Sequence, residues 1–141
     1  MKLRDIMTDD LSCVNPNSSV NKAARVMKNL NVGSVPVCEG KKPVGIITDR
    51  DITIRNVADK NNPDQPVNKI MSSNLVYGSP DMSVDEAAQI MADNQIRRLP
   101  IVENGKLIGI VSLGDIAVDS SADIEAAEAL TNISVPSKPA R

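Results

Sequence analysis

The sequence contains one eight-residue pattern twice. GIITDRDI occupies residues 45–52 and GIVSLGDI occupies residues 109–116, 64 residues later. The same offset aligns other identical positions without a gap, among them Ile6-Met7 with Ile70-Met71, Pro16 with Pro80, and Pro36 with Pro100. A register kept over this length indicates two copies of one supersecondary unit. Because one copy cannot bury its apolar face alone, we expect the two to pack as one pseudo-two-fold domain.

The first helix of each copy is indicated by the spacing of its apolar residues. Positions 20, 23, 24, 27 and 30 follow the i, i+3, i+4, i+7 rule, which predicts a helix over 20–30 with an equivalent at 84–94. Ser19 and Ser83 are the predicted N-caps. Ser83 and Glu86 have the spacing of a full capping box, whereas the first copy has Lys22 at the second position and lacks it.

Two strands are expected after each of these helices. They lie at about 34–38 and 98–102, then at PVGIIT and LIGIVS, with EGKK and ENGK as hairpin turns. A second helix begins after Thr48 or Ser112. A short strand before each of the repeated prolines completes a β-α-β-β-α unit, so the predicted fold class is α/β (α+β).

The chain divides into four predicted regions. Repeat one covers 1–58, the polar stretch DKNNPDQPVN at 59–68 is the linker, and repeat two covers 69–120. The C-terminal extension is 121–141. Its DIEAAEALTNI stretch favours a helix, and SVPSKPAR is typical of disorder.

Composition excludes several functions. The net charge of −2 argues against a general nucleic-acid binder, and no apolar run is long enough to span a membrane. There is no histidine, which excludes histidine-ligated metals and histidine acid–base chemistry. Cys13 and Cys38 are predicted to be small buried hydrophobes in a reducing, cytoplasmic compartment.

The Ser/Thr-x-x-Asp spacing at Thr48–Asp51 and Ser112–Asp115 suits two roles. It is a helix capping motif, because the hydroxyl lies at the N-cap and the carboxylate one turn later. It also suits a ribose-phosphate: the hydroxyl can donate to a phosphate oxygen, and the acceptor-only carboxylate can accept from a 2′,3′-diol. Both readings remain open at this stage, and both can hold together.

The repeated motifs resemble the cystathionine β-synthase (CBS) domain. The similarity rests on Pro-x-x-Ser-Val-x-x-Ala-Ala, a hydrophobic-Pro-hydrophobic strand, and Gly-Ile-hydrophobic-Ser/Thr-x-x-Asp-Ile, each present twice. It covers about residues 3–118 as a tandem pair and is close to small stand-alone bacterial and archaeal proteins, including the hypoxic response protein group. The resemblance implies a non-enzymatic sensor that binds AMP, ATP, NAD or S-adenosylmethionine, forms a homodimer and acts on an unknown protein target. The alternative is a ligand-free dimeric scaffold.

The resemblance also implies two pockets shared between the repeats. One joins Thr48, Asp51, Gly33 and Ser34 with Tyr77, Gly78 and Ile96; the other joins Ser112, Gly114, Asp115, Arg97 and Arg98 with Val14, Asn15 and Val32. By this resemblance, Asp51 and Asp115 hold the ribose of the ligand. Arg97 and Arg98 bind its phosphate or are solvated surface residues, and Val32 and Ile96 flank the adenine or are plain core residues.

The two motifs are not identical. Repeat one has Asp49-Arg50 where repeat two has Leu113-Gly114. Arg50 is open to two interpretations, as a phosphate ligand or as a salt-bridge partner that fills the pocket. Catalysis is disfavoured, because Asp51, Asp115 and Cys38 form no visible pair of base and nucleophile. The Asp115 site is expected to bind better.

Overall fold

The computed structural model describes residues 1–9, 11–118 and 129–133, and these form two compact units. Unit one consists of Met1–Asp9, Val76–Glu103 and the described residues from Ile108 onward. Unit two takes the chain from residue 11 to Leu75, with Asn104–Leu107. Each unit therefore draws on more than one stretch of the chain.

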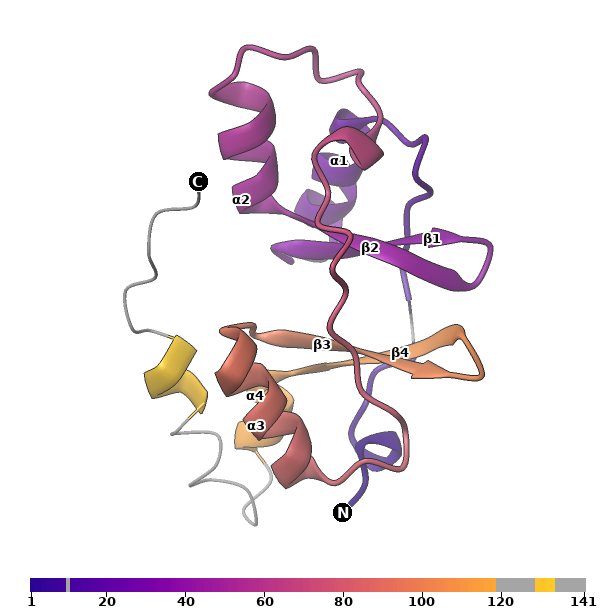
Figure 1. Ribbon diagram of the computed structural model, residues 1–141, viewed down its shortest axis with the longest axis vertical. Helices are drawn as coiled ribbons and strands as arrows, with labels where there is room; N and C mark the ends of the chain where they lie inside the picture. Colours follow the sequence, from indigo (N-terminus) through magenta and orange to yellow (C-terminus); the bar gives the residue numbers. More distant parts are fainter. Residues whose placement is uncertain (10, 119–128, 134–141) are drawn as a thin grey trace. The chain divides into compact units, whose positions relative to one another are not determined.

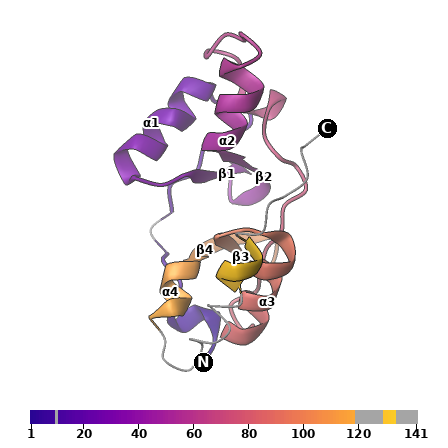
Figure 2. The same cartoon turned by 90° about the vertical axis from the view of Figure 1, so that its left-hand side faces the viewer.

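Unit two is built on a hairpin with helices over one of its faces (Figures 1 and 2). Its elements are α1 (Val20–Leu30), β1 (Ser34–Glu39), β2 (Lys42–Thr48), α2 (Asp49–Ile52), the π-helix η2 (Thr53–Val57) and the 3-10 helix η3 (Val67–Lys69). β1 and β2 pair antiparallel, with Ser34 opposite Thr48. The aliphatic core between hairpin and helices contains Val14, Val20, Ala23, Met27, Val35, Val37, Ile47, Val67 and Ile70.

Unit one repeats this arrangement (Figure 1). It contains the 3-10 helix η1 (Leu3–Asp5), α3 (Val84–Asn94), β3 (Arg98–Glu103), β4 (Lys106–Ser112) from Ile108 onward, and α4 (Leu113–Ala117). The turn between β3 and β4 has Asn104 and Gly105 at positive φ, as a tight hairpin requires. The mixed α/β fold class is confirmed. The strands predicted before the two prolines are single parallel bridges, Val14 with Val37 and Gly78 with Ile101.

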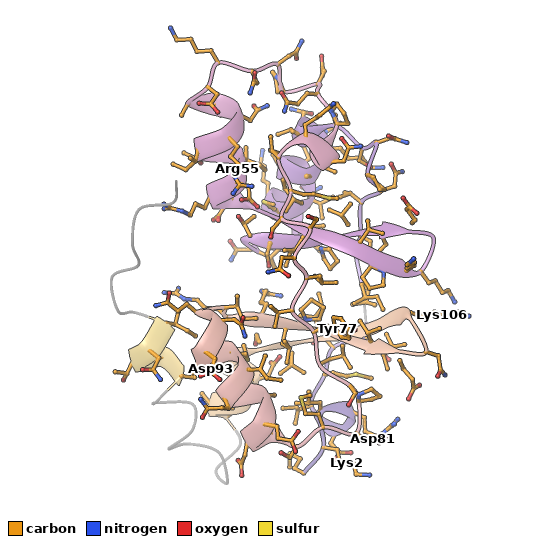
Figure 3. The ribbon with its side chains drawn as sticks, viewed as in Figure 1. Lys2, Arg55, Tyr77, Asp81, Asp93 and Lys106 are labelled. Carbon is orange, nitrogen blue, oxygen red and sulfur yellow. The ribbon has the colours of Figure 1, made fainter. Side chains whose placement is uncertain are left out.

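Each unit is completed by the segment that begins the other copy of the repeat. Leu3 is fully buried in the core of unit one, and Val67 is fully buried in that of unit two. On the surface of unit one, Asp81 Oδ1 lies 3.0 Å from Arg4 Nη2 and 3.6 Å from Lys2 Nζ (Figure 3). These exposed ion pairs add to the burial of Leu3 in holding the N-terminal segment.

The packing of each unit against the segment from the other copy also explains the repeated glycines. A Cβ at Gly45 would lie 2.7 Å from the carbonyl oxygen of Ser72 and 2.8 Å from Met71 Sδ. A Cβ at Gly109 would lie 2.6 Å from Met7 Sδ. The glycine of each copy therefore makes room for the Ile-Met segment of the other copy, which accounts for both features recurring together.

Both predicted N-caps are present, with one correction. Ser19 Oγ accepts from the Lys22 N–H at 3.0 Å, and Ser83 Oγ accepts from the Glu86 N–H at 3.1 Å. The predicted reciprocal bond from the Glu86 side chain is absent among the described residues, so the full capping box at Ser83 is wrong. The Glu86 side chain is exposed to solvent instead.

Two burial predictions are also corrected. Leu30, placed on the buried stripe of α1, is 50% exposed because it is the last residue of the helix. Cys38 is buried as predicted, but Cys13 is exposed because only the single bridge at Val14 joins its segment to β1. An exposed thiol beside a sheet is open to chemistry that a buried one is not.

The predicted C-terminal helix lies partly outside the described residues. Residues 129–133 are helical, Ala129 is fully buried, and the Asn132 carbonyl accepts from Gln95 Nε2 at 2.9 Å. The predicted disorder of SVPSKPAR lies outside the described residues. Within the described part of the chain, no helix is long and apolar enough to cross a membrane.

Candidate functional site

The two Ser/Thr-x-x-Asp motifs form reciprocal capping boxes. Thr48 Oγ1 accepts from the Asp51 N–H and Asp51 Oδ2 accepts from the Thr48 N–H, both at 3.0 Å. Ser112 Oγ accepts from the Asp115 N–H at 3.0 Å, and Asp115 Oδ2 accepts from the Ser112 N–H at 2.9 Å. Two free N–H groups are satisfied where each strand turns into its helix. The capping interpretation of the motif is confirmed.

Capping uses only part of the hydrogen-bonding capacity of the hydroxyl and the carboxylate in each motif. The hydroxyl of Ser112 accepts a bond but still has its own hydrogen to donate, and Asp115 keeps Oδ1, which has no hydrogen-bond partner among the described residues. Asp115 is only partly buried. The motif can therefore cap the helix and offer one donor and one acceptor to a ligand together.

In unit one, the backbone brings Arg97 beside this motif. The Leu113 N–H donates to the Arg97 carbonyl at 2.8 Å, which joins the start of α4 to the residue before β3. Arg97 is exposed, and Arg98 is partly buried at the first position of β3. In the described part of the chain neither guanidinium has an ion-pair partner. Gly114 is exposed, and the nearest atom to a Cβ there is Ser112 Oγ at 3.6 Å.

In unit two, an additional carboxylate lies against the equivalent motif. The Asp49 N–H donates to the Gly33 carbonyl at 2.9 Å, and Asp49 Oδ1 accepts from the Arg50 N–H at 2.8 Å. A Cβ on Gly33 would lie 3.0 Å from Asp49 Oδ2. The Asp49 carboxylate thus lies directly over Gly33, a negative charge that Leu113 does not supply in unit one.

The cation beside Asp51 is Arg55, which sequence reasoning missed. Arg55 Nη1 lies 3.9 Å from Asp51 Oδ1 and donates to the Ile70 carbonyl at 3.2 Å; Figure 3 shows Arg55 extending from its helix. Arg50, for which two roles were open, forms no side-chain ion pair among the described residues. The i, i+4 spacing of Asp51 and Arg55 was the pattern that could have indicated the pair.

The remaining predicted site residues lie within their own units. In unit two, Val14 is buried, Asn15 accepts at Oδ1 from the Asn17 N–H at 2.9 Å, Val32 packs on the core, and Ser34 pairs with Thr48. In unit one, Tyr77 is 54% exposed and Ile96 packs on the core. Gly78 is buried, and a Cβ there would lie 3.0 Å from Leu99 Cδ2. The joining of these two sets into shared pockets stays a prediction.

Metal binding has no support among the described side chains. They contain no group of three or more histidine, cysteine, aspartate and glutamate residues that could hold an ion. The aspartates of both motifs are engaged with backbone N–H groups rather than with a nucleophile. The arrangement is suited to recognising a polyol or an anion.

Comparison with known proteins identifies the family. The CBS domain profile matches residues 3–55 and 67–121. The CBS domain-containing protein YhcV of Bacillus subtilis is 47% identical over 132 residues, 94% of each chain. Hypoxic response protein 1 of Mycobacterium tuberculosis is 31% identical over 116 residues, 81% of each chain. The chain belongs to the CBS domain family and is a regulatory CBS pair.

Solved structures share the fold. A crystal structure of hypoxic response protein I with two coordinated zinc ions matches with a TM-score of 0.78 and 30% identity, covering 84% of this chain and 98% of that one. A CBS domain protein of Pyrobaculum aerophilum complexed with AMP matches with a TM-score of 0.80 and 24% identity, covering 90% and 98%. At that identity the second likeness concerns the fold alone.

Proposed function

We propose that this CBS pair is a non-enzymatic sensor that binds an adenosine-containing ligand through its Ser/Thr-x-x-Asp motifs. The observation that carries the proposal is the half-used capping box. Asp115 gives Oδ2 to the backbone and retains Oδ1, which can accept from a ribose hydroxyl. Ser112 retains a hydroxyl hydrogen for a second ligand oxygen. The Pyrobaculum aerophilum protein, which shares the fold, is complexed with AMP, and AMP is therefore the first ligand to test.

The two motifs differ in the charge that surrounds them, which favours the Asp115 site for a phosphorylated ligand. Arg97 and Arg98 lie at the start of β3 without an ion-pair partner among the described residues, so their guanidinium groups can pair with phosphate oxygens. At the other motif, Arg55 is near Asp51, and the Asp49 carboxylate lies over Gly33. A phosphate bound at the Asp51 motif would be repelled by the Asp49 carboxylate.

The decisive experiment separates capping from ligand binding. Asp115→Asn keeps an oxygen for the Ser112 N–H but replaces the free carboxylate oxygen with an NH2 group, so the fold is expected to survive. Isothermal titration calorimetry with AMP, ADP, ATP, NAD and S-adenosylmethionine should show affinity falling about ten- to a hundredfold, the cost of a charge-assisted bond. The matched variant Asp51→Asn should weaken binding less.

The phosphate assignment has its own test. Arg98→Ala should weaken AMP more than adenosine, because only AMP carries the phosphate. Equal weakening of both would assign Arg98 to the fold instead. If none of the five ligands binds or shifts the melting temperature at millimolar concentration, the sensor proposal fails.

The alternative function is a ligand-free dimeric scaffold. Unit two has exposed apolar side chains on its helices, with Leu30 50%, Ile54 47% and Val57 65% exposed, which fits a surface that a second copy covers. Light scattering should show a dimer under either function. A dimer that ignores every adenosine ligand would favour the scaffold, and a monomer at micromolar concentration would refute the homodimer.

A further inference from the structure

The two cysteines of the chain meet in unit two. The Val14 N–H donates to the Pro36 carbonyl at 3.1 Å, and the Val14 carbonyl accepts from the Cys38 N–H at 2.8 Å. This parallel bridge holds the segment that contains Cys13 alongside β1, where Cys38 lies. Each thiol shifts the pKa of the other, and hydrogen bonding between them is the main cause. Cys13 is exposed and Cys38 is 3% exposed, so only one of the two sulfurs is open to solvent.

The hydrogen bond makes the two thiols chemically unequal. The Cys38 S–H donates to the Cys13 sulfur and lowers the pKa of Cys13 to about 7, an effect larger than the opposing one of partial burial. The same bond, with burial, raises the pKa of Cys38. Among the described residues, the Cys38 thiol of β1 is the titratable group that shifts the pKa of Cys13. An ordinary cysteine has a pKa of about 8.5, so Cys13 has much more thiolate near neutral pH.

We infer that Cys13 and Cys38 form a thiol–disulfide exchange site for low-molecular-weight disulfides, with Cys13 as the nucleophile and Cys38 as the resolving thiol. Cys13 is accessible and already polarised by its partner, and thiolates of near-ambient pKa are the most effective attackers of a disulfide. Cys38 is shielded from the small disulfide but lies on β1 beside the segment of Cys13, the residue that would carry the adduct. The division of roles follows from these two exposures.

The exchange is balanced in two steps. The Cys13 thiolate attacks one sulfur of a disulfide RSSR, forms the Cys13–S–SR bond, and releases RS⁻. Cys38 then gives up its proton and attacks the Cys13 sulfur, forming the Cys13–Cys38 disulfide and releasing the second RS⁻. The protons of the two cysteines end on the two released thiolates as RSH. The two cysteines are oxidised and RSSR is reduced, so no further oxidant is needed.

The product would tie the segment at Cys13 covalently to β1. A disulfide of ordinary geometry has its two sulfurs about 2.05 Å apart. The loop that this bond closes contains the whole of α1. Oxidation therefore adds a covalent link between β1 and a segment that is otherwise joined to it by the single bridge at Val14.

The test uses the reduced full-length protein and oxidised glutathione at pH 7, followed by intact-mass spectrometry and disulfide mapping. Wild type is expected to lose two hydrogens and yield a peptide pair joined through Cys13 and Cys38, while remaining a single covalent chain. Cys38→Ser should stop at a mixed disulfide with glutathione on Cys13. Cys13→Ser should stay unmodified, because Cys38 is buried.

A second measurement follows alkylation of Cys13 in place of disulfide formation. The rate of alkylation of wild-type Cys13 by iodoacetamide should rise with pH around a midpoint near 7, and Cys38→Ala, which removes the donor, should move this midpoint toward about 8.5. The inference is overturned if wild type stays reduced, if it carries glutathione on Cys13 without forming the internal disulfide, or if its alkylation midpoint is that of an ordinary cysteine.

Discussion

Replacing Gly45 by alanine tests whether the segment at Met71 and Ser72 holds unit two together. The new Cβ would lie 2.7 Å from the Ser72 carbonyl oxygen and 2.8 Å from Met71 Sδ. The Met71 side chain can rotate away. The Ser72 backbone is fixed, because the Ile46 N–H donates to its carbonyl at 2.9 Å and its own N–H donates to the Ile46 carbonyl at 3.0 Å. Relief of about 0.7 Å, to reach ordinary contact distance, must therefore strain this pair of bonds.

The magnitude follows from two opposing effects. Overpacking a filled site costs about 1–3 kcal/mol. Alanine also lowers the conformational entropy of the unfolded chain relative to glycine, which raises the free energy of unfolding by about 0.4–1 kcal/mol. We expect a net loss of about 1–2 kcal/mol for Gly45→Ala, or a fall in melting temperature of roughly 3–7 °C for a chain of this length.

Two other glycines provide graded controls for the same thermal melts, followed by circular dichroism. At Gly109 the closest atom is Met7 Sδ at 2.6 Å, and the backbone oxygen of Thr8 is farther away at 3.2 Å, so a side-chain movement relieves most of the clash. At Gly114 the nearest atom is Ser112 Oγ at 3.6 Å, and alanine should stabilise α4 by about 0.5–1 kcal/mol. If Gly45→Ala melts at or above Gly114→Ala, the reasoning is refuted.

Three further outcomes test the rest of the fold. Leu3→Ala removes a fully buried side chain and should lower the free energy of unfolding by about 2–5 kcal/mol in urea denaturation; an unchanged midpoint would contradict a core role for η1. Ser83→Ala removes the N-cap of α3 and should cost about 1 kcal/mol in the same assay. Arg4 holds the pKa of the exposed Asp81 below its usual range, so the stabilisation from this pair is present above about pH 3.9 and is lost as the pH falls through the lower folded-state pKa. The melting temperatures of wild type and Asp81→Asn should therefore differ at pH 7 and converge in acid.

The parts of the site that could be predicted from sequence are those fixed by near neighbours. Thr48 and Asp51 are three residues apart, and one helical turn brings them into the capping box whatever surrounds them. The same holds for Ser112 and Asp115. Helix and strand positions were also predictable from near neighbours, because the spacing of apolar residues along the chain indicates which face of an element is buried.

The parts that sequence did not indicate depend on contacts between distant residues. Cys13 and Cys38 meet only because one bridge at Val14 sets the segment beside β1. The short strand expected before Pro16 suggested that Cys13 is buried, but the pairing there is too short to cover it. The position of Asp49 over Gly33 likewise follows from the Asp49 N–H bond to the Gly33 carbonyl, which no local pattern encodes.

The duplicated sequence has a physical consequence for folding. Gly45 belongs to the first copy and Met71, which fills the space beside it, belongs to the second; Gly109 and Met7 have the reverse relation. Each unit therefore needs residues from both copies to close its core. A single copy made alone would leave its glycine face and the cavity for Leu3 or Val67 uncovered, and it could close only by taking the segment of another molecule. The two repeats are thus mutually dependent rather than two independent folds in series, which explains why the glycine and the Ile-Met pair recur together in both copies.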